Sequence, residues 1–234
     1  MKKNIEFGII IQARTGSKRF PKKSLSKLGN KRLIDWVIDR VKKVKNIKKI
    51  VLATTDLKED KILVKIAKEK KIYYFQGNSQ NVLKRFYDTA EHFSIKKIIR
   101  VCGDNPFISP EFIENLINNF SSNDYDIGFN HIPYKNFKCA NGFGAEIFET
   151  SLLKKIIKKK ISKLQEEHVT KYFWDNHKKF KIKPIPIKKI YKNSKLKYDV
   201  DYRRDLNYLN QLLKKSKIDI NTTASEIVKL TEKK

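Results

Sequence analysis

The sequence predicts an α/β domain built on an open, mostly parallel sheet. Short apolar runs of the kind that form buried strands recur along the first half of the chain, and each is followed by apolar residues at helical spacing. Parallel strands covered on both faces by crossover helices are the simplest arrangement of such an alternation. The chain has 234 residues, and we expect residues 1–234 to form a single domain.

The first two strand–helix units occupy residues 7–67. The run Phe7 to Ile11 predicts the first strand, and apolar residues at helical spacing over 34–44 predict the helix that follows its polar loop. Ile50 to Ala53 predicts the second strand. Asp56 is expected to cap the next helix, whose apolar face lies within 62–67.

Two further units complete the first half. Tyr73 to Phe75 predicts a third strand, and the apolar residues over 82–93 predict its helix. Ile98 to Cys102 predicts a fourth strand that ends at Gly103-Asp104-Asn105-Pro106. Pro110, at a position that suits the first turn of a helix, opens the next one.

The second half, from about Tyr125, has a looser pattern. We expect, in chain order, a glycine-containing loop at 141–144, a helix over 151–160, a helix over 166–174, an edge strand over 181–187, a strand over 196–201 and a helix over 206–213. The edge position is predicted because two prolines interrupt 181–187 and proline cannot donate to a central ladder.

The charge of the chain suggests a nucleic-acid partner at first sight, but its composition argues against one. The formal net charge is +28, carried by 45 Lys and only 8 Arg, with the Lys in scattered pairs and triplets. Proteins that read bases or phosphates bidentately favour Arg, whereas Lys is accepted on any solvated surface. We therefore expect a lysine-biased surface and no nucleic-acid partner, although anionic small ligands would still be attracted.

The compartment is predicted from what the sequence lacks. No stretch approaches the roughly 18 apolar residues of a membrane span, and no small-residue cleavage site follows the N-terminus. Cys102 and Cys139 form no CxxC pair and have no neighbouring His, so neither a disulfide framework nor a zinc site is predicted. We expect a cytoplasmic protein with no membrane partner.

The loop after the first strand gathers groups that bind phosphate. The segment Gln12-Ala13-Arg14-Thr15-Gly16-Ser17-Lys18-Arg19-Phe20-Pro21-Lys22-Lys23 holds one Gly, two hydroxyls, two Arg and three Lys. Main-chain N–H groups of a Gly/Ser turn cradle phosphate, Arg supplies forked donors and Lys a point charge. The loop is not a Walker A motif. The alternative is an ordinary exposed loop in a lysine-rich protein.

Two aspartates at predicted strand ends could hold a divalent metal. Asp104 follows the fourth strand and Asp201 closes the run Tyr198 to Val200, although each could equally cap a helix or turn. Asp199 shares a face with Asp201 if this segment is a strand. Other polar groups are expected in loops, at 54–56, at 76–78, at Glu146 and at 166–168. His168 is more often a salt-bridged or capping residue than a base, and stays outside the core set.

Several blocks of the chain resemble the cytidylyltransferases of sugar activation, and within them the branch named for spore coat polysaccharide biosynthesis protein F. This branch is related to CMP-sialate and CMP-3-deoxy-manno-octulosonate synthetases. The likeness is colinear over about 210 residues. It is carried by the segments 10–25, 51–56, 75–86, 100–108, 167–170 and 200–206.

The resemblance implies a fold and an assembly. It implies a nucleotide-diphospho-sugar transferase fold, which is a Rossmann-like, mostly parallel mixed sheet flanked by helices, and a homodimer formed through a small β-rich portion at about 125–175. The chain departs from the family pattern at Lys22, where Gly is frequent, at Tyr202-Arg203-Arg204, where Thr-Pro-Glu is frequent, and at Gly144, where an acidic residue is common. These departures concern the contacts on the acceptor side.

The resemblance also implies a reaction and its residues. An oxygen of the acceptor, a sugar or other small acidic or phosphorylated molecule, displaces pyrophosphate from the α-phosphorus of CTP, with Mg²⁺ as cofactor. The product is the CMP or CDP derivative of the acceptor, for surface glycan biosynthesis. The implied catalytic residues are Arg14, Lys23, Asp104 and Asp201, and the last two would hold the metal. The implied nucleotide-binding residues are Gln12, Ala13, Arg14, Thr15, Gly16, Ser17, Arg19, Lys23, Thr54, Asp56, Gln76, Gly77, Arg85 and Gly103.

Two other functions fit parts of the sequence. A glycosyltransferase of related architecture would use a DxD-type metal motif, which Asp199-Val200-Asp201 spells, but the basic loop at 12–23 has no role in that account. A nucleic-acid-binding protein would show a stripe of Arg with stacking aromatics, which the 8 Arg do not form. A third possibility is a regulatory or structural domain whose acceptor site has decayed, which binding of CTP without turnover would reveal.

Overall fold

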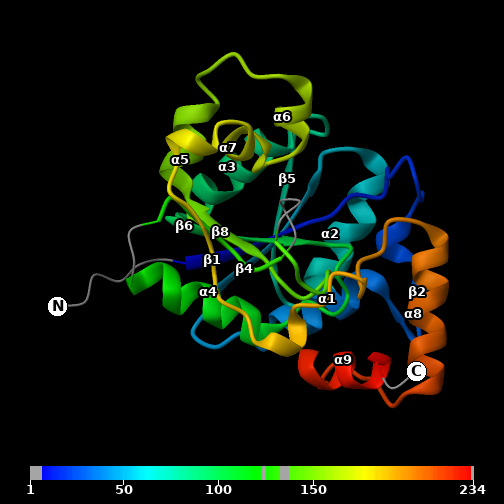
Figure 1. Cartoon of the computed structure of the whole chain (residues 1–234). Coiled ribbons are helices and arrows are strands. Elements are labelled where there is room, and N and C mark those ends of the chain that lie inside the picture. The colour runs from blue at the N-terminus through cyan, green and yellow to red at the C-terminus, as the bar shows by residue number, and fades with distance from the viewer. Residues whose placement is uncertain (1–6, 123–124, 132–136, 233–234) are drawn as a thin grey trace.

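A mixed seven-stranded sheet forms the centre of the molecule in the computed structural model, which describes residues 7–122, 125–131 and 137–232 (Figure 1). The strand order is β5-β4-β1-β6-β8-β7-β9. These strands are β1 (Phe7–Gln12), β4 (Lys49–Thr55), β5 (Tyr73–Gly77), β6 (Lys97–Cys102), β7 (Ile127–Phe129), β8 (Glu146–Glu149) and β9 (Ile182–Pro184). Only β8 runs antiparallel to its neighbours in this sheet. The predicted mostly parallel α/β sheet is confirmed.

Helices cover both faces of the sheet because its inner strands carry apolar side chains on both sides. One hydrophobic cluster joins alternate residues of β1, β4 and β6 to α1 (Leu33–Val41), α2 (Lys61–Glu69) and α4 (Pro110–Ser122). A second joins the other set to α3 (Val82–His92), α5 (Thr150–Ile156) and α7 (Lys171–Asp175). The short helix α6 (Lys163–Glu167) lies next to α3. Burying apolar residues on both faces is what a parallel sheet requires.

A third cluster joins the C-terminal helices to the N-terminal part of the chain. The helices α8 (Arg203–Lys215) and α9 (Ala224–Glu232) pack with a short hairpin of β2 (Lys27–Leu28) and β3 (Lys31–Arg32) and with the outer face of α1. Single 3-10 turns complete the described elements, at η1 (Lys23–Leu25), η2 (Lys58–Asp60), η3 (His177–Lys179) and η4 (Lys189–Tyr191). The first and last parts of the chain thus share one core.

Several element predictions need correction. Residues 196–201 form no strand: the segment makes one isolated bridge, Lys197 to Asn141, and its Val200 N–H bonds to the carbonyl of Asp104, two residues after β6. The helix expected over 166–174 is two helices, broken at 168–170, and α5 ends at Ile156 instead of about 160. Asp56 does not cap a helix, because the N-cap residue of α2 is Asp60 and that of η2 before it is Leu57.

Other second-half predictions hold or stay open. The segment expected at the sheet edge does lie there, as β9. The predicted dimerisation portion at 125–175 includes residues 132–136, which lie outside the described residues, and it remains a prediction. Within the described part of the chain, no helix is long and apolar enough to cross a bilayer.

The sheet order creates a crevice at the carboxyl ends of β1 and β6. From β1 the chain continues through α1 to β4 on one side, and β6 lies on the other side. Ligands of open α/β sheets bind where the strand order reverses in this way. The Gly103 N–H donates to the Gln12 carbonyl at 2.8 Å, and a Cβ on Gly103 would lie 2.7 Å from that oxygen. Glycine therefore lets the end of β6 approach the end of β1.

Candidate functional site

The loop between β1 and η1 is held in shape by a buried carboxylate. Asp60, at the end of η2, is 1% exposed and accepts hydrogen bonds from the Thr15 N–H at 2.7 Å and from the Thr15 hydroxyl at 2.6 Å. The Thr55 hydroxyl donates to its other oxygen. The Lys22 N–H then closes the loop on the Thr15 carbonyl at 2.8 Å. Buried polar groups bonded in this way fix one backbone conformation.

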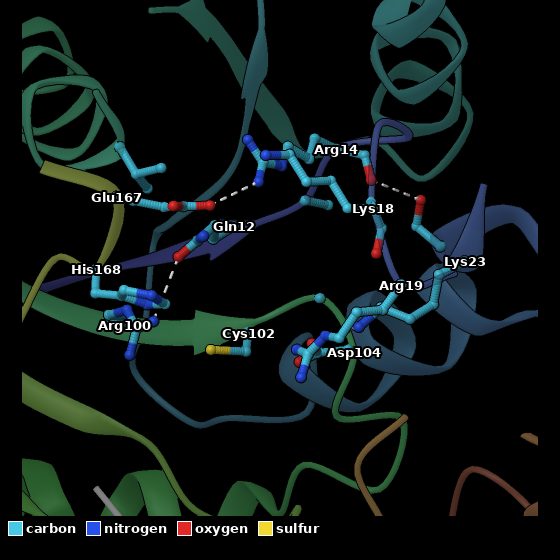
Figure 2. Close-up of a pocket in the computed structure, with 15 residues that line it drawn as sticks. Gln12, Arg14, Lys18, Arg19, Lys23, Arg100, Cys102, Asp104, Glu167 and His168 are labelled. Carbon is cyan, nitrogen blue, oxygen red and sulfur yellow. Dashed lines mark hydrogen bonds and ion pairs between the residues drawn. The ribbon is translucent and has the colours of Figure 1, made fainter. Parts of the chain in front are cut away.

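A pocket of about 490 Å³ opens between this loop, the end of β6 and the end of α6 (Figure 2). Five cationic side chains line it, namely Arg14, Lys18, Arg19, Lys23 and Arg100. Its other lining residues are Gln12, Ala13, Ser17, Ser24, Val82, Cys102, Gly103, Asp104, Glu167 and His168. A concave site with several converging polar groups at this edge of the sheet is the expected location of a ligand.

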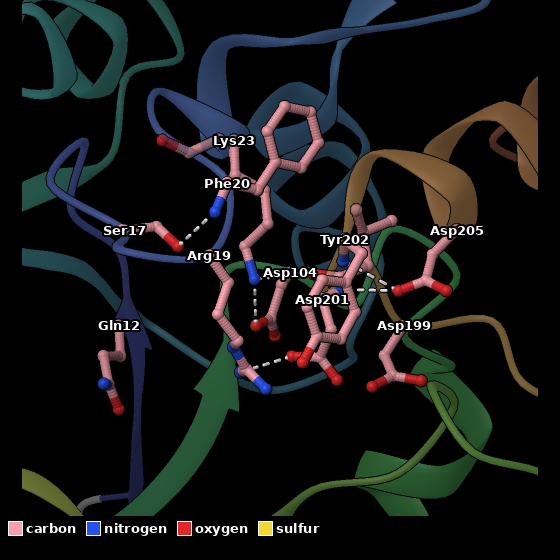
Figure 3. A network of polar contacts seen from close by, with 12 residues as sticks. Gln12, Ser17, Arg19, Phe20, Lys23, Asp104, Asp199, Asp201, Tyr202 and Asp205 are labelled. Atoms are coloured by element: carbon pink, nitrogen blue, oxygen red, sulfur yellow. Dashed lines mark hydrogen bonds and ion pairs between the residues drawn. The ribbon is translucent and has the colours of Figure 1, made fainter.

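Three cations at the rim of the pocket are paired with carboxylates from distant segments. Lys23 Nζ lies 2.8 Å from Asp104 Oδ2 and also donates to the Val200 carbonyl at 2.6 Å. The guanidinium of Arg19 bonds Asp201 Oδ1 at 2.6 Å (Figure 3). The Arg14 guanidinium bonds Glu167 Oε1 at 3.1 Å. The loop thus reaches both predicted metal-binding aspartates and α6.

The other two aspartates of this region have different partners. Asp205 accepts from the Asp201 and Tyr202 N–H groups, both at 2.8 Å, and so caps the start of α8. Its second partner is Lys197, whose Nζ also lies 3.7 Å from Asp199 and 3.6 Å from Asp201. Burial raises the pKa of Asp199 to about 6, an effect that Asp201 and Asp104 add to and Lys197 opposes.

The floor of the pocket is a buried ion pair. Arg100 of β6 and Glu146 of β8 stand opposite each other in the sheet, with Nη1 and Oε2 2.6 Å apart. Glu146 is 1% exposed and also accepts from the Thr170 hydroxyl at 3.2 Å, with His131 Nε2 at 3.6 Å. Burial alone would raise the pKa of Glu146, but Arg100 and His131 lower it to about 2. Glu146 was expected in a loop; it is instead the first residue of a strand.

Two potentially reactive side chains in the pocket are held uncharged. Burial lowers the pKa of His168, which lies at the break between α6 and α7, and nearby Arg100 and Lys171 act in the same direction. Burial raises the pKa of the Cys102 thiol to about 11, so it is protonated at neutral pH and is a poor nucleophile. Neutral His168 can donate and accept hydrogen bonds to a ligand.

The structure divides the predicted site residues into two groups. Pocket-lining members are Gln12, Ala13, Arg14, Ser17, Arg19, Lys23, Gly103 and Asp104. Asp201 lies at the rim through its bond to Arg19. The remaining predictions are not among the lining residues: Thr15, Gly16, Thr54, Asp56, Gln76, Gly77 and Arg85.

The residues outside the lining support its walls. Thr15 faces Asp60, and Thr54 is fully buried. Gln76 donates to the Thr55 carbonyl at 3.3 Å. Arg85 is fully buried and donates to the Asn78 carbonyl at 2.7 Å. Burial lowers the pKa of Arg85 to about 10.

Sequence reasoning missed the residues whose roles depend on distant partners. Asp60 stands before a helical stretch, which on sequence alone indicates a cap. Arg100 interrupts an apolar strand, and a charged residue within a buried run is the one signal that could have pointed to a pocket floor. Lys18 of the basic loop and Glu167 and His168 of the polar segment 166–168 were singled out without an assigned role, and the structure places all three on the pocket lining.

The carboxylates at the rim fit a divalent metal of the kind that keeps most of its ligands on substrate. In the described residues no group of three or more His, Cys, Asp and Glu side chains forms a ready-made metal cage. Mg²⁺, however, is usually bound by one or two carboxylates together with phosphate oxygens and water. Asp104 and Asp201 each already hold a positive group, Lys23 and Arg19 respectively, which shows that both carboxylates are placed to receive positive charge.

Comparison with known proteins gives one consistent answer. A family model described as cytidylyltransferase matches residues 8–234. An uncharacterized protein of Methanocaldococcus jannaschii is 33% identical, with 96% of this chain and 89% of that one covered. A spore coat polysaccharide biosynthesis protein of Bacillus subtilis is 29% identical, with 94% and 92% covered. The structure of a cytidylyltransferase from Leptospira borgpetersenii superimposes with a TM-score of 0.90 at 26% identity, with 98% and 94% covered.

Proposed function

Because the chain belongs to the cytidylyltransferase family, we propose that it transfers the CMP group of CTP to a small acidic or phosphorylated acceptor and releases pyrophosphate. The product would be the CMP or CDP derivative of a sugar or related compound, used for a surface glycan. The observation that carries the proposal is the pocket itself, where the loop after β1 brings cationic side chains against Asp104 and Asp201.

The triphosphate would lie along the loop between Arg14 and Lys23. Pyrophosphate leaves with more negative charge than it carries within CTP, so fixed cations near it favour the transition state. Lys23 supplies a mobile point charge, and the guanidinium groups of Arg14 and Arg19 supply forked donors. The bonds from Thr15 to Asp60 keep the loop in one conformation, so that these groups need little rearrangement when CTP binds.

Asp104 and Asp201 would hold Mg²⁺. When bound, the metal supplies charge neutralisation at the α-phosphate and lowers the pKa of an acceptor hydroxyl. A dedicated side-chain base is then not required. Asp205 and Lys197 position Asp201, the first through the main-chain N–H of Asp201 and the second through its carboxylate.

The acceptor would lie over the floor of the pocket. Gln12, Cys102 and His168 surround Arg100 there, and Figure 2 shows them on the side away from Lys23. A carboxylate or phosphate on the acceptor would meet the Arg100 guanidinium, whose charge Glu146 balances from below. This placement leaves the loop to the triphosphate.

Ligand stabilisation and product formation together test the proposed function. The protein is heated with CTP, UTP, GTP or ATP, each with and without Mg²⁺, and CTP with Mg²⁺ is expected to raise Tm most, because a ligand that binds only the folded state stabilises it. Pyrophosphate release is then followed with a panel of acidic and phosphorylated sugars, including 3-deoxy-manno-octulosonate. No Tm shift with any nucleotide, or no CTP-dependent pyrophosphate release across the panel, would argue against the proposal.

A further inference from the structure

Lys23 forms an ion pair with Asp104, one of the two carboxylates that the proposed reaction needs to hold its metal. Its Nζ lies 2.8 Å from Asp104 Oδ2 and 2.6 Å from the Val200 carbonyl oxygen, and its side chain is only 12% exposed. Asp104 is 31% exposed on the pocket side. The ammonium group thus stands between the loop after β1 and both segments that carry the predicted metal-binding aspartates.

An ammonium and a divalent cation compete for the same oxygen. While Lys23 donates to Asp104 Oδ2, that oxygen has already met its positive partner, and a second cation nearby would be repelled. A triphosphate reverses this balance, since its oxygens offer Lys23 another strong acceptor. The long, flexible stem of lysine allows such an exchange of partners, which the planar fork of Arg makes harder.

We propose that Lys23 is a positioning residue that withholds Asp104 from divalent metal until a nucleoside triphosphate draws its ammonium group away. Metal and nucleotide then bind cooperatively, and the empty enzyme has low affinity for free metal. The inference rests on the proposed function, because it takes the metal site at Asp104 and Asp201 from there. Arg19 acts in the same sense on Asp201 but more weakly, because at 57% exposure its charge is screened by water.

Lys18 provides the matched control. It lines the same pocket from the same loop, yet among the described residues it has no carboxylate within ion-pair distance. Removing its charge changes the net charge of the pocket by the same amount as removing that of Lys23. Any difference between the two variants therefore reports the contact with Asp104 and not the general loss of a cation.

The test is direct binding of Mn²⁺, the probe metal, to the full chain without nucleotide. Wild type, Lys23→Met, Arg19→Met and Lys18→Met are titrated with Mn²⁺ and followed by the electron paramagnetic resonance of the free ion. We expect Lys23→Met to bind Mn²⁺ more tightly than wild type by about fivefold or more, Arg19→Met by about twofold, and Lys18→Met with less change than either. Far-ultraviolet circular dichroism verifies that each variant is folded.

A second titration, with CTP present, separates the two proposals. Coupling between sites is reciprocal, so the ratio of Mn²⁺ affinities with and without CTP should be large in wild type and smaller in Lys23→Met. If wild type binds Mn²⁺ with CTP but Lys23→Met binds it no more tightly than wild type without CTP, the role of Lys23 is refuted and the metal site stands. If no variant binds Mn²⁺ even with CTP, the metal site fails and the inference fails with it.

Discussion

The rim and the floor of the pocket are both built from cation–carboxylate pairs, but the pairs differ in their access to water. The carboxylates of the rim pairs, which are Asp104, Asp201 and Glu167, are 25–48% exposed, whereas Glu146 at the floor is 1% exposed. An exposed pair contributes little to stability and exchanges partners readily, while one member of a buried pair cannot be lost without leaving an uncompensated charge. Cation–carboxylate pairs can therefore change partners at the rim of the pocket, whereas the pair at the floor keeps a fixed geometry.

The largest effect is expected at the rim, on turnover. Replacing Asp104 or Asp201 by Asn should lower kcat with CTP by about 1,000-fold or more, because the carboxylate proposed to hold the metal is lost. Stability should change little, since each side chain is at least 25% exposed. Asp88→Asn is the control, since this α3 side chain is 30% exposed, a fraction close to those of Asp104 and Asp201, and lies outside the pocket lining. Wild-type turnover in either pocket variant would remove that residue from the proposed metal site.

The next effect is expected at the floor, on folding. Glu146→Gln leaves Arg100 buried without a counter-charge and should lower the free energy of unfolding by about 3 kcal/mol or more. Urea unfolding measures it. Glu149→Gln, an exposed change on the same strand, should shift stability by no more than about 0.5 kcal/mol.

A double variant makes the comparison sharper. In Arg100→Met combined with Glu146→Leu both charges are gone, so most of the lost stability should return. A loss below about 1 kcal/mol in Glu146→Gln would mean that the pair does not behave as a buried one.

The floor pair also predicts how stability depends on pH. The folded pKa of Glu146 is about 2, below the ordinary value of 4.5, so the unfolded state takes up the proton first as pH falls. The contribution of the Glu146 charge to the free energy of unfolding is complete above the pKa that Glu146 has in the unfolded state. It is lost as the pH falls through the lower pKa of the folded state. Urea midpoints measured from pH 6 to pH 2 should therefore converge for wild type and Glu146→Gln. A constant gap across this range would contradict the assignment.

The smallest effect is expected at the rim, on affinity. Glu167→Gln releases Arg14 from its carboxylate and should tighten CTP binding by about two- to threefold, with stability nearly unchanged. Calorimetric titration with CTP measures it, and Glu166→Gln on the same helix is the control. If CTP binding weakens instead, Glu167 contacts the nucleotide and is not merely a competitor for Arg14.

Whether the partners of a residue are near or far in the sequence explains what the sequence could predict. β1, its basic loop and Asp104 were recognisable because a buried run, a glycine and polar residues at a strand end are local signals. Glu146 was placed in a loop because its strand is only four residues long and its partner Arg100 is 46 positions away. The role of Asp60 depends on Thr15, 45 positions away, and no spacing rule joins them.

The segment 196–201 shows the opposite error. Its apolar run indicates a strand, yet in the structure it belongs to no sheet and bonds through Val200 N–H to the Asp104 carbonyl at 2.9 Å. Periodicity reports burial, and this segment is buried against the C-terminal cluster without joining the sheet. Asp201 was predicted at the site as the residue that ends a strand. In the structure it reaches the site because Val200 bonds to Asp104 and Arg19 bonds to Asp201 itself.

The long separation between the partners of Lys23 has a consequence for how the protein matures. Its loop is made early during synthesis, but the carbonyl of Val200 lies 177 positions later and the partner of Arg19 lies 182 positions later. A nascent chain emerging at about 5–20 residues per second would hold the central strands for several seconds before these partners exist. A chain that has not yet reached residue 201 therefore lacks both partners, and these two contacts form only in nearly complete molecules.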